Sequence, residues 1–248
     1  MVQLSNREIK EIKSLAAKKF RDETGLFVVE GEKMVREALE SRFEVVNVYR
    51  RDEIGDEAMS RISQLSSPSP VLAVVRRPAG IDECPADIGD GLYLALDSIR
   101  DPGNLGTILR IADWFGVKSV LATPDTVEIF NPKVVQSTMG AIFRVDFHYV
   151  DLQAFAKSVL DKGGKVYGTF LDGRNIYDCD LSTGTESPAV IVIGNEANGI
   201  SDGMASIVSD RLFIPPFPID DPGSESLNAA VATAVTVAEF RRRAHASK

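Results

Sequence analysis

The stretch GLYLALDSIRDPGNLGTILRIADWFGVKSVLAT, residues 91–123, decides the fold class. It opens with mostly apolar residues that predict a buried strand, which ends at a polar Pro-Gly turn. The following NLGTILRIADWFG has apolar residues at helical spacing, and KSVLAT predicts a second strand. Because strands and helices keep alternating to the C-terminus, we predict an α/β domain whose parallel sheet has helices on both faces.

A smaller α/β unit precedes this domain. Its pattern predicts a helix over 6–19, the strand GLFVVEG, a helix over 32–41 and strands over 43–49 and 68–75. The next residues are rich in Pro, Gly and Asp without periodicity, which is typical of a linker. We therefore expect a first domain at 1–78, a linker at 79–91 and a second domain at 92–248.

Composition narrows the class of protein. The chain has 248 residues, 44% of them hydrophobic, so it is long enough to bury a core. No run approaches 18 consecutive apolar residues, and the first 20 residues lack the apolar stretch of a signal peptide, so we expect a cytoplasmic protein. Two distant cysteines and two histidines disfavour zinc sites and histidine-centred triads, and no metal is expected.

Charge is distributed unevenly. The net charge of −8 argues against a general nucleic-acid coat protein. Basic side chains nevertheless gather near the N-terminus, and a solvated helix face is the plainer explanation for them. The basic residues are Arg7, Lys10, Lys13, Lys18, Lys19 and Arg21.

The first segment that could carry chemistry runs from Asp97 to Gly116. The end of a buried strand is where open parallel sheets bind ligands, and we expect Asn104 to cap the helix that follows. Arg110 lies between aliphatic neighbours, where a guanidinium needs an anion. An exposed pair with Asp113 is the alternative.

Two further segments have similar character. AVIVIGNEANGI, residues 189–200, is an apolar strand that opens into a turn with two glycines and Glu196, and it matches neither a dinucleotide-binding nor a P-loop pattern. The glycines either let a ligand approach or simply turn the chain. Residues 213–243 run from a proline-rich loop into a helix that is apolar nearly all round. Ser226 fits the cap of that helix, whereas Asn228 is less well explained as one.

Together, NLGTILR, IVIGNEANGIS and FIPPFPIDDPGSESLNAAVATA resemble the three ordered motifs of the SpoU, or TrmH-like, RNA ribose methyltransferases of the SPOUT superfamily. GLFVVEGEKMVREAL is similar to that family's ribosomal-protein-like RNA-binding domain. The resemblance implies a C-terminal deep trefoil knot, a homodimer packed through the knotted region and S-adenosylmethionine as cofactor. The third motif departs from the family pattern, in which a shorter Ile-Pro-Met segment is common before Ser-Leu-Asn.

The resemblance also assigns roles to residues of this chain. The implied catalytic residues are Asn104, Arg110, Glu196, Ser226 and Asn228. Cofactor contacts, mostly through main chain, are implied near Ile193, Gly194, Ile214 and Leu227. The RNA-binding residues that we expect are Lys10, Lys13, Lys18, Lys19 and Arg21.

The implied reaction is methylation of a ribose 2′-hydroxyl in structured RNA, with ribosomal RNA favoured over transfer RNA. Proton removal from that hydroxyl is needed, and Arg110 either accepts the proton or stabilises the developing alkoxide. Because guanidinium resists deprotonation, stabilisation is the simpler role. Two alternatives stay open: a non-catalytic dimeric RNA-binding protein on this fold, and a methyltransferase with a non-RNA acceptor.

Overall fold

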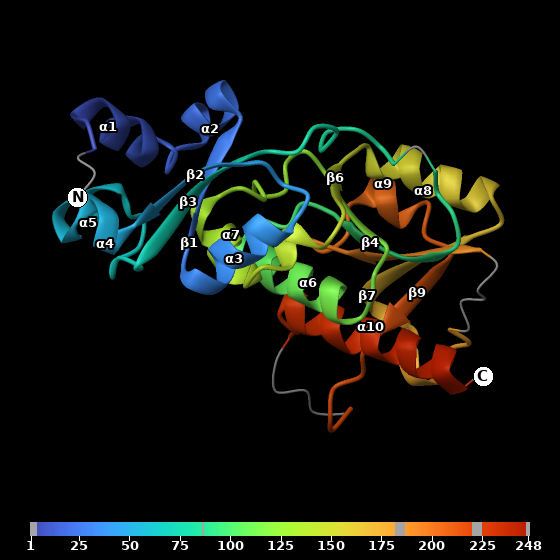
Figure 1. The fold of residues 1–248 in the computed structure, drawn as a ribbon. Helices are drawn as coiled ribbons and strands as arrows, with labels where there is room; N and C mark the ends of the chain where they lie inside the picture. The colour runs from blue at the N-terminus through green and yellow to red at the C-terminus, as the bar shows by residue number, and fades with distance from the viewer. Residues whose placement is uncertain (1–3, 86, 182–186, 220–224, 247–248) are drawn as a thin grey trace. The chain divides into compact units, whose positions relative to one another are not determined.

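The computed structural model of the protein describes residues 4–85, 87–181, 187–219 and 225–246 (Figure 1). Its contacts divide it into two compact units. The first contains residues 1–79 and 128–144, and the second contains residues 80–127 and 145–248.

The first unit is built on a three-stranded antiparallel sheet. Its strands, in spatial order, are β1 (Leu26–Glu30), β3 (Val71–Arg76) and β2 (Val45–Arg50). Its helices are α1 (Asn6–Ser14), α2 (Lys18–Thr24), α3 (Glu32–Glu40), α4 (Arg51–Ile54), α5 (Asp56–Ile62), α7 (Pro132–Thr138) and the 3-10 turn η1 (Ala141–Phe143). Apolar residues of α1, α4 and α5 form a core with β1, β2 and β3.

The helix that we expected over residues 6–19 is two helices. Ser5 caps α1 in a capping box with Glu8, and α1 ends at Ser14. A short break follows before α2, which ends at Gly25 in a left-handed conformation with φ of 67°. Residues 15–17 are therefore outside both helices, and the expected single helix is interrupted there. The sequence pattern also missed α4 and α5.

The second unit confirms the predicted parallel sheet. All of its strand pairs are parallel, in the order β6-β5-β4-β8-β7-β9. The strands are β4 (Gly91–Leu96), β5 (Ser119–Ala122), β6 (Phe147–Tyr149), β7 (Lys165–Asn175), β8 (Pro188–Ile193) and β9 (Asp210–Phe213). The helices are α6 (Pro102–Trp114), α8 (Leu152–Asp161), the 3-10 turn η2 (Ile176–Asp178), α9 (Asp202–Ala205) and α10 (Ala229–Ala246).

Helices cover both faces of this sheet, as predicted. Figure 1 shows α8 and α9 on one side of the sheet and α6 and α10 on the other. On the first side, Phe155 packs edge-on against Tyr93 with 5.9 Å between ring centroids. On the second side, Phe240 of α10 packs edge-on against Tyr167 of β7, with 4.9 Å between ring centroids. None of the helices within the described ranges is long and apolar enough to span a bilayer.

Residues 80–91 have no helix or strand before β4 among their described positions, yet they are fastened to the second unit. The carbonyl of Ile81 accepts from the amide of Tyr149 at 2.7 Å, and that of Ile88 accepts from Lys162 at 3.0 Å. Ile88 also belongs to the core of that unit. This segment therefore packs on the second unit and is not a free linker.

Residues 128–144 lie between β5 and β6 in the sequence but pack in the first unit. Phe130 stacks on Phe27 of β1 with 4.7 Å between ring centroids. Glu128 accepts from the guanidinium of Arg21 at 3.1 and 2.5 Å, and both side chains are buried. An ion pair hidden from water in this way is screened little by salt.

Candidate active site

The loop after β4 is fixed by polar contacts before α6 begins. Ser98 has φ of 63°, unusual for a residue with a side chain, and its hydroxyl donates to Asp125 at 2.7 Å. Arg100 donates to the same carboxylate at 2.6 Å. Hydrogen bonds from Thr123 and Ser98 and the charge of Arg100 hold the pKa of Asp125 below its usual value, against the opposing effect of burial. Asp125 is thus ionised at neutral pH and anchors this loop to β5.

Asp101, rather than Asn104, caps α6. Its carboxylate accepts from the backbone amide of Asn104 at 2.7 Å, and Pro102 occupies the first helical position. The expected capping role of Asn104 is therefore wrong. Because the cap is provided elsewhere, the side chain of Asn104 is available for contacts outside α6.

Those contacts join three segments that are far apart in the sequence. The Asn104 amide nitrogen donates to Glu196 at 2.8 Å, and its amide oxygen accepts from Asn228 at 2.8 Å. Asn104 is 8% exposed, whereas Glu196 and Asn228 are exposed, so each bond joins a buried side chain to one at the surface. The three side chains form one chain of hydrogen bonds across the starts of α6 and α10 and the loop after β8.

The loop after β8 is tied to the end of β4 at two further points. Asn195 donates to the carbonyl of Ser98 at 2.7 Å, and the buried carboxylate of Asp97 accepts from the amide of Ser201 at 2.7 Å. Sequence analysis missed both residues as supports of the site. The available signal was the run of short polar residues at the ends of two predicted strands, where parallel sheets place their sites.

The backbone geometry of this loop requires its two glycines. A Cβ on Gly194 would lie 2.3 Å from the backbone of Gly199 and Ile200. Gly199 has φ of 69° and pairs with Asn195 in an isolated bridge. Of the two explanations left open for these glycines, turning the chain accounts for both.

Asn228 caps α10, which corrects the expectation that Ser226 does so. Its amide oxygen accepts from the backbone of Ala230 at 2.9 Å and of Val231 at 3.2 Å. The amide oxygen of Asn228 therefore caps the helix, and its amide nitrogen donates to Asn104 and orients that side chain. Ser226 is exposed. The stretch 220–224 of the third motif lies outside the described residues.

Arg110 is exposed on α6, although its neighbours in the sequence are aliphatic. Within the part of the chain that the structure describes, its side chain forms no hydrogen bond or ion pair. The apolar stripe predicted for this helix is buried as expected, namely Leu105, Ile108, Leu109 and Ala112. Neither Arg110 nor Ser226 takes part in the Glu196–Asn104–Asn228 chain.

The four residues expected at the cofactor lie at strand ends or before α10. Ile193 ends β8 and is buried, and Ile214 follows β9 directly. Leu227 precedes the α10 cap with half of its surface exposed. None of the four carries a charged side chain, and main chain at the ends of parallel strands is a usual place for a ligand. This set fits a largely neutral adenosyl group held by backbone and apolar contacts.

The expected RNA-binding residues divide into three kinds. Arg21 is 2% exposed, and besides Glu128 it donates to two backbone carbonyls near the end of α1, so it is a structural residue and is removed from the set. Lys18 and Lys19 are exposed but pair with Asp22 and Glu23 one turn later. Lys10 and Lys13 are exposed and form no ion pair with any described residue.

These features define a class of protein: a parallel α/β domain whose polar site lies at the carboxyl ends of its strands, joined to a small domain with basic helices. The model of the SpoU rRNA methylase family matches residues 91–238, and that of the MRM3-like substrate binding domain matches residues 6–74. The chain therefore belongs to the SpoU rRNA methylase family, and it is an RNA methyltransferase.

Named relatives agree along nearly the full length. The chain is 32% identical to the 23S rRNA (guanosine(2553)-2′-O)-methyltransferase RlmP of Bacillus subtilis, over 95% of this chain and 96% of the relative. A solved TrmH-family structure from Porphyromonas gingivalis has a TM-score of 0.84 at 36% identity, covering 98% of this chain and all of the other. An AdoMet-bound rRNA methyltransferase from Sinorhizobium meliloti has a TM-score of 0.85 at 28% identity, covering 97% of each chain.

Proposed function

We propose that this protein transfers a methyl group from S-adenosylmethionine to a ribose 2′-hydroxyl of ribosomal RNA. The observation that carries the proposal is the hydrogen-bonded chain of Glu196, Asn104 and Asn228. It brings together one side chain from each of the three motif segments at the edge of the sheet where ligands bind. The relative RlmP is named for 2′-O-methylation of 23S rRNA, which favours ribosomal over transfer RNA.

Different residues of the site hold the cofactor and position the ribose. S-adenosylmethionine supplies an electrophilic methyl group when bound. Main chain at Ile193, Gly194 and Ile214 at the strand ends, and at Leu227 before α10, would hold it. Glu196, Asn104 and Asn228 give the site a fixed donor and acceptor pattern, which positions the ribose without reorganisation during the reaction.

The ribose oxygen displaces the methyl group from the sulfonium and loses its proton to water at this exposed site, and Arg110 stabilises the charge that develops on the oxygen. The exposure of Arg110 means that the RNA itself has to supply the anionic partner, and a backbone phosphate has the right charge and geometry for a guanidinium. A phosphate and an alkoxide can share the two edges of the planar group. Ser226, exposed just before the α10 cap, lies where it can contact the same nucleotide.

Domain roles follow from the same proposal. The predicted first domain, residues 1–78, binds the RNA substrate together with residues 128–144 of the same unit, and the second unit, which includes most of the predicted linker 79–91 and of the predicted domain 92–248, carries out the transfer. The reaction takes place in the cytoplasm. The C-terminal part of the chain forms a deep trefoil knot, for which the support is membership of the family together with the position of β8 between β4 and β7.

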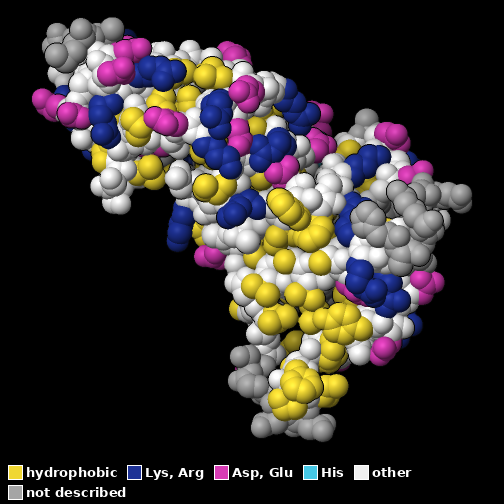
Figure 2. All heavy atoms as spheres, turned by 60° about the horizontal axis from the view of Figure 1, so that its bottom comes forward, with side chains coloured by type: hydrophobic (Ala, Val, Ile, Leu, Met, Phe, Trp, Pro, Cys, Tyr) yellow, Lys and Arg dark blue, Asp and Glu magenta, His cyan; other side chains and the backbone are white. Residues whose placement is uncertain are grey.

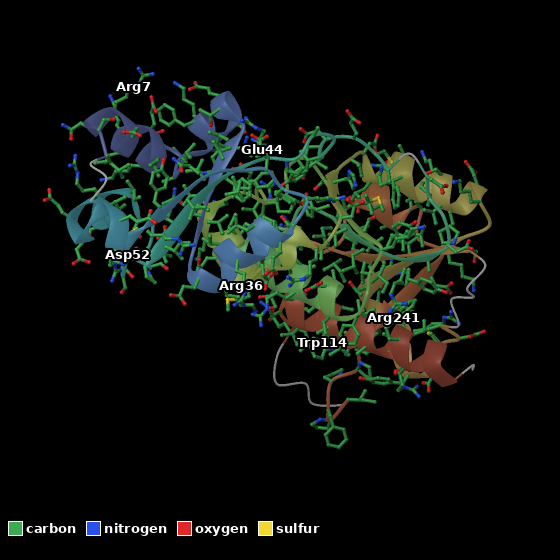
Figure 3. All side chains as sticks on the ribbon, viewed as in Figure 1. Arg7, Arg36, Glu44, Asp52, Trp114 and Arg241 are labelled. Atoms are coloured by element: carbon green, nitrogen blue, oxygen red, sulfur yellow. The ribbon has the colours of Figure 1, made fainter. Side chains whose placement is uncertain are left out.

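The enzyme acts as a homodimer through the second domain. Trp114 of α6 is 85% exposed, and Leu227 and Val231 at the start of α10 are each about half exposed. Figure 2 shows hydrophobic side chains gathered on the side of the molecule where α6 and α10 lie, and Figure 3 shows Trp114 beside α10. An uncovered apolar surface of this kind is typical of a protein interface. Trp114→Glu should convert a sedimenting dimer into a monomer, and a variant that stays dimeric would contradict this interface.

The transfer itself is tested with tritiated S-adenosylmethionine and total RNA from a strain that lacks the gene. Native protein should label ribosomal RNA, and Arg110→Ala should lose transfer while calorimetry still detects cofactor binding. Arg36→Ala is the matched control, because Arg36 is an exposed arginine on α3 of the other unit (Figure 3). Near-full activity of Arg110→Lys would show that a point charge suffices. Cofactor binding without transfer to any RNA would refute the proposal.

A further inference from the structure

The first unit contains a groove of about 630 Å³ between its first two helices and its sheet. One face of α1 lines it with Arg7 and Lys10, α2 contributes Phe20, and β2 contributes Tyr49. Figure 3 shows Arg7 projecting from α1. The volume falls in the range of about 300–1,000 Å³ that is usual for sites of small ligands. All the lining residues belong to the first unit, so the groove is complete within it.

The interior of the groove is apolar and partly aromatic. Buried Ile12 and Leu15 lie along it, and Phe20 is 39% exposed although it is a large aromatic side chain. An exposed aromatic ring beside an apolar wall is a suitable surface for stacking a nucleobase, since every base has a π face.

A hydrogen-bond donor within the groove is unused. The hydroxyl of Tyr49, a residue 8% exposed, accepts from the amide of Asn47 at 3.0 Å. It donates to no residue in the part of the chain that the structure describes. Burial raises the pKa of this phenol, so it keeps its proton at neutral pH. A donor in an apolar groove with no acceptor in the described protein is free to bind an acceptor of a ligand, and base carbonyls and ring nitrogens are such acceptors.

The rim of the groove carries positive charge. Lys10 has no ion-pair partner among the described residues, and Arg7 pairs with Glu11 only at the surface, where both side chains are more than half exposed. Surface pairs of this kind are weak and open readily to a stronger anion. The groove thus combines an aromatic wall, a free donor and cations at its edge, which is the set of groups that a nucleotide requires.

We propose that this groove binds one unpaired nucleotide of the RNA, with the base against Phe20, a base acceptor at the Tyr49 hydroxyl and a phosphate at Lys10. The identity of the ligand as RNA rests on the proposed function. The groove would read a splayed nucleotide rather than a duplex, because a base within a duplex does not expose its face. It therefore selects for RNA structure at a point separate from the nucleotide that is methylated.

The proposal is tested by anisotropy on the full chain with fluorescein-labelled ten-nucleotide oligouridine and oligoadenosine and with a twelve-base-pair RNA duplex. Phe20→Leu should weaken single-strand binding about ten-fold, in line with loss of one stacked base, and leave duplex binding unchanged. Tyr49→Phe, which removes only the hydroxyl, should weaken it several-fold. Leu39→Ala, an exposed apolar residue on α3, is the control.

Two lysines of α1 provide a test variant and a matched control for the role of positive charge. Lys10→Ala should weaken single-strand binding several-fold and reduce the salt dependence by about one phosphate contact. Lys13 is exposed and unpaired among the described residues on the same helix but does not line the groove, so Lys13→Ala should have a smaller effect. Equal losses from the two variants, or single-strand binding that Phe20→Leu leaves unchanged, would overturn the proposal. Failure of the native chain to bind either oligonucleotide would do the same.

Methyl transfer separates this inference from the proposed function. If both hold, the groove variants raise KM for ribosomal RNA and leave kcat and cofactor affinity unchanged. Normal transfer kinetics in all groove variants would refute the groove alone. Groove-dependent binding of oligonucleotides by a chain that methylates no RNA would support the groove and refute the proposed reaction.

Discussion

Replacing Asn104 by aspartate tests the central hydrogen-bond chain by changing one group. Asn104→Asp exchanges the amide nitrogen that faces Glu196 for a carboxylate oxygen, at a position where donor and acceptor are now 2.8 Å apart. The oxygen that accepts from Asn228 stays in place. At that separation, two like charges repel by about 1.5 kcal/mol in water and about 6 kcal/mol at an effective dielectric constant of 20. Because Glu196 is exposed and can move away, the lower part of this range applies.

We therefore expect Asn104→Asp to lower the free energy of unfolding by about 2 kcal/mol at pH 7, the sum of the lost hydrogen bond and the remaining repulsion. The measurement is urea unfolding at equilibrium, with the midpoint shifted and the slope unchanged. Glu196→Gln alone should change stability little, since a glutamine still offers an acceptor oxygen to Asn104. Combined with Asn104→Asp, it should restore most of the loss, because the new amide donates to the new carboxylate.

The reasoning is refuted if Asn104→Asp unfolds at the same urea concentration as the native chain. It is also refuted if the double variant is no more stable than Asn104→Asp alone, because the loss would then come from a source other than Glu196. Methyl transfer by the double variant adds a second readout. A site that depends on the pattern of donors and acceptors should stay impaired even when stability returns.

Three further predictions concern stability. Arg21→Met leaves the buried carboxylate of Glu128 unpaired and should cost about 3–5 kcal/mol in urea unfolding, whereas Arg21→Met with Glu128→Leu should regain part of this loss. The guanidinium of Arg242, aided by that of Arg243, lowers the pKa of Glu239 from 4.5 to about 2. Because the folded pKa is the lower one, Glu239→Gln should cost about 1 kcal/mol at neutral pH, and calorimetric scans should show the difference vanish as the pH falls from about 4.5 to about 2. Gly194→Ala places a Cβ against backbone and should cost about 1–3 kcal/mol or more by thermal unfolding.

Much of the fold of the second unit follows from the sequence, because each of its strands and helices has a clear local pattern. The parallel sheet with two covered faces is a consequence of that alternation. The placement of residues 128–144 in the first unit does not follow, since it depends on contacts such as Arg21 with Glu128, 107 positions apart. Local periodicity holds no information about such pairs.

For the site, the sequence identified the residue types but not their partners. Asn104, Glu196 and Asn228 were selected by resemblance, while the bonds between them span 92 and 124 positions. The exposure of Arg110, in contrast, was available from the helix pattern. At 100° per residue, Arg110 lies about 140° from Leu105, on the side opposite the apolar stripe. The apolar neighbours in the sequence were misleading, because adjacent residues of a helix do not share a face.

The same geometry connects Arg110 to the proposed dimer. Trp114 follows Arg110 by four residues, so the two side chains share the exposed face of α6. A second copy that covers Trp114 therefore also approaches the guanidinium and removes water from one side of it. Electrostatic stabilisation strengthens when water is excluded, so we expect Arg110 to stabilise the alkoxide better in the proposed dimer than in the isolated chain. Dimerisation and catalysis are then two consequences of one helix face, and transfer by Trp114→Glu should fail even though its own Glu196, Asn104 and Asn228 remain in place.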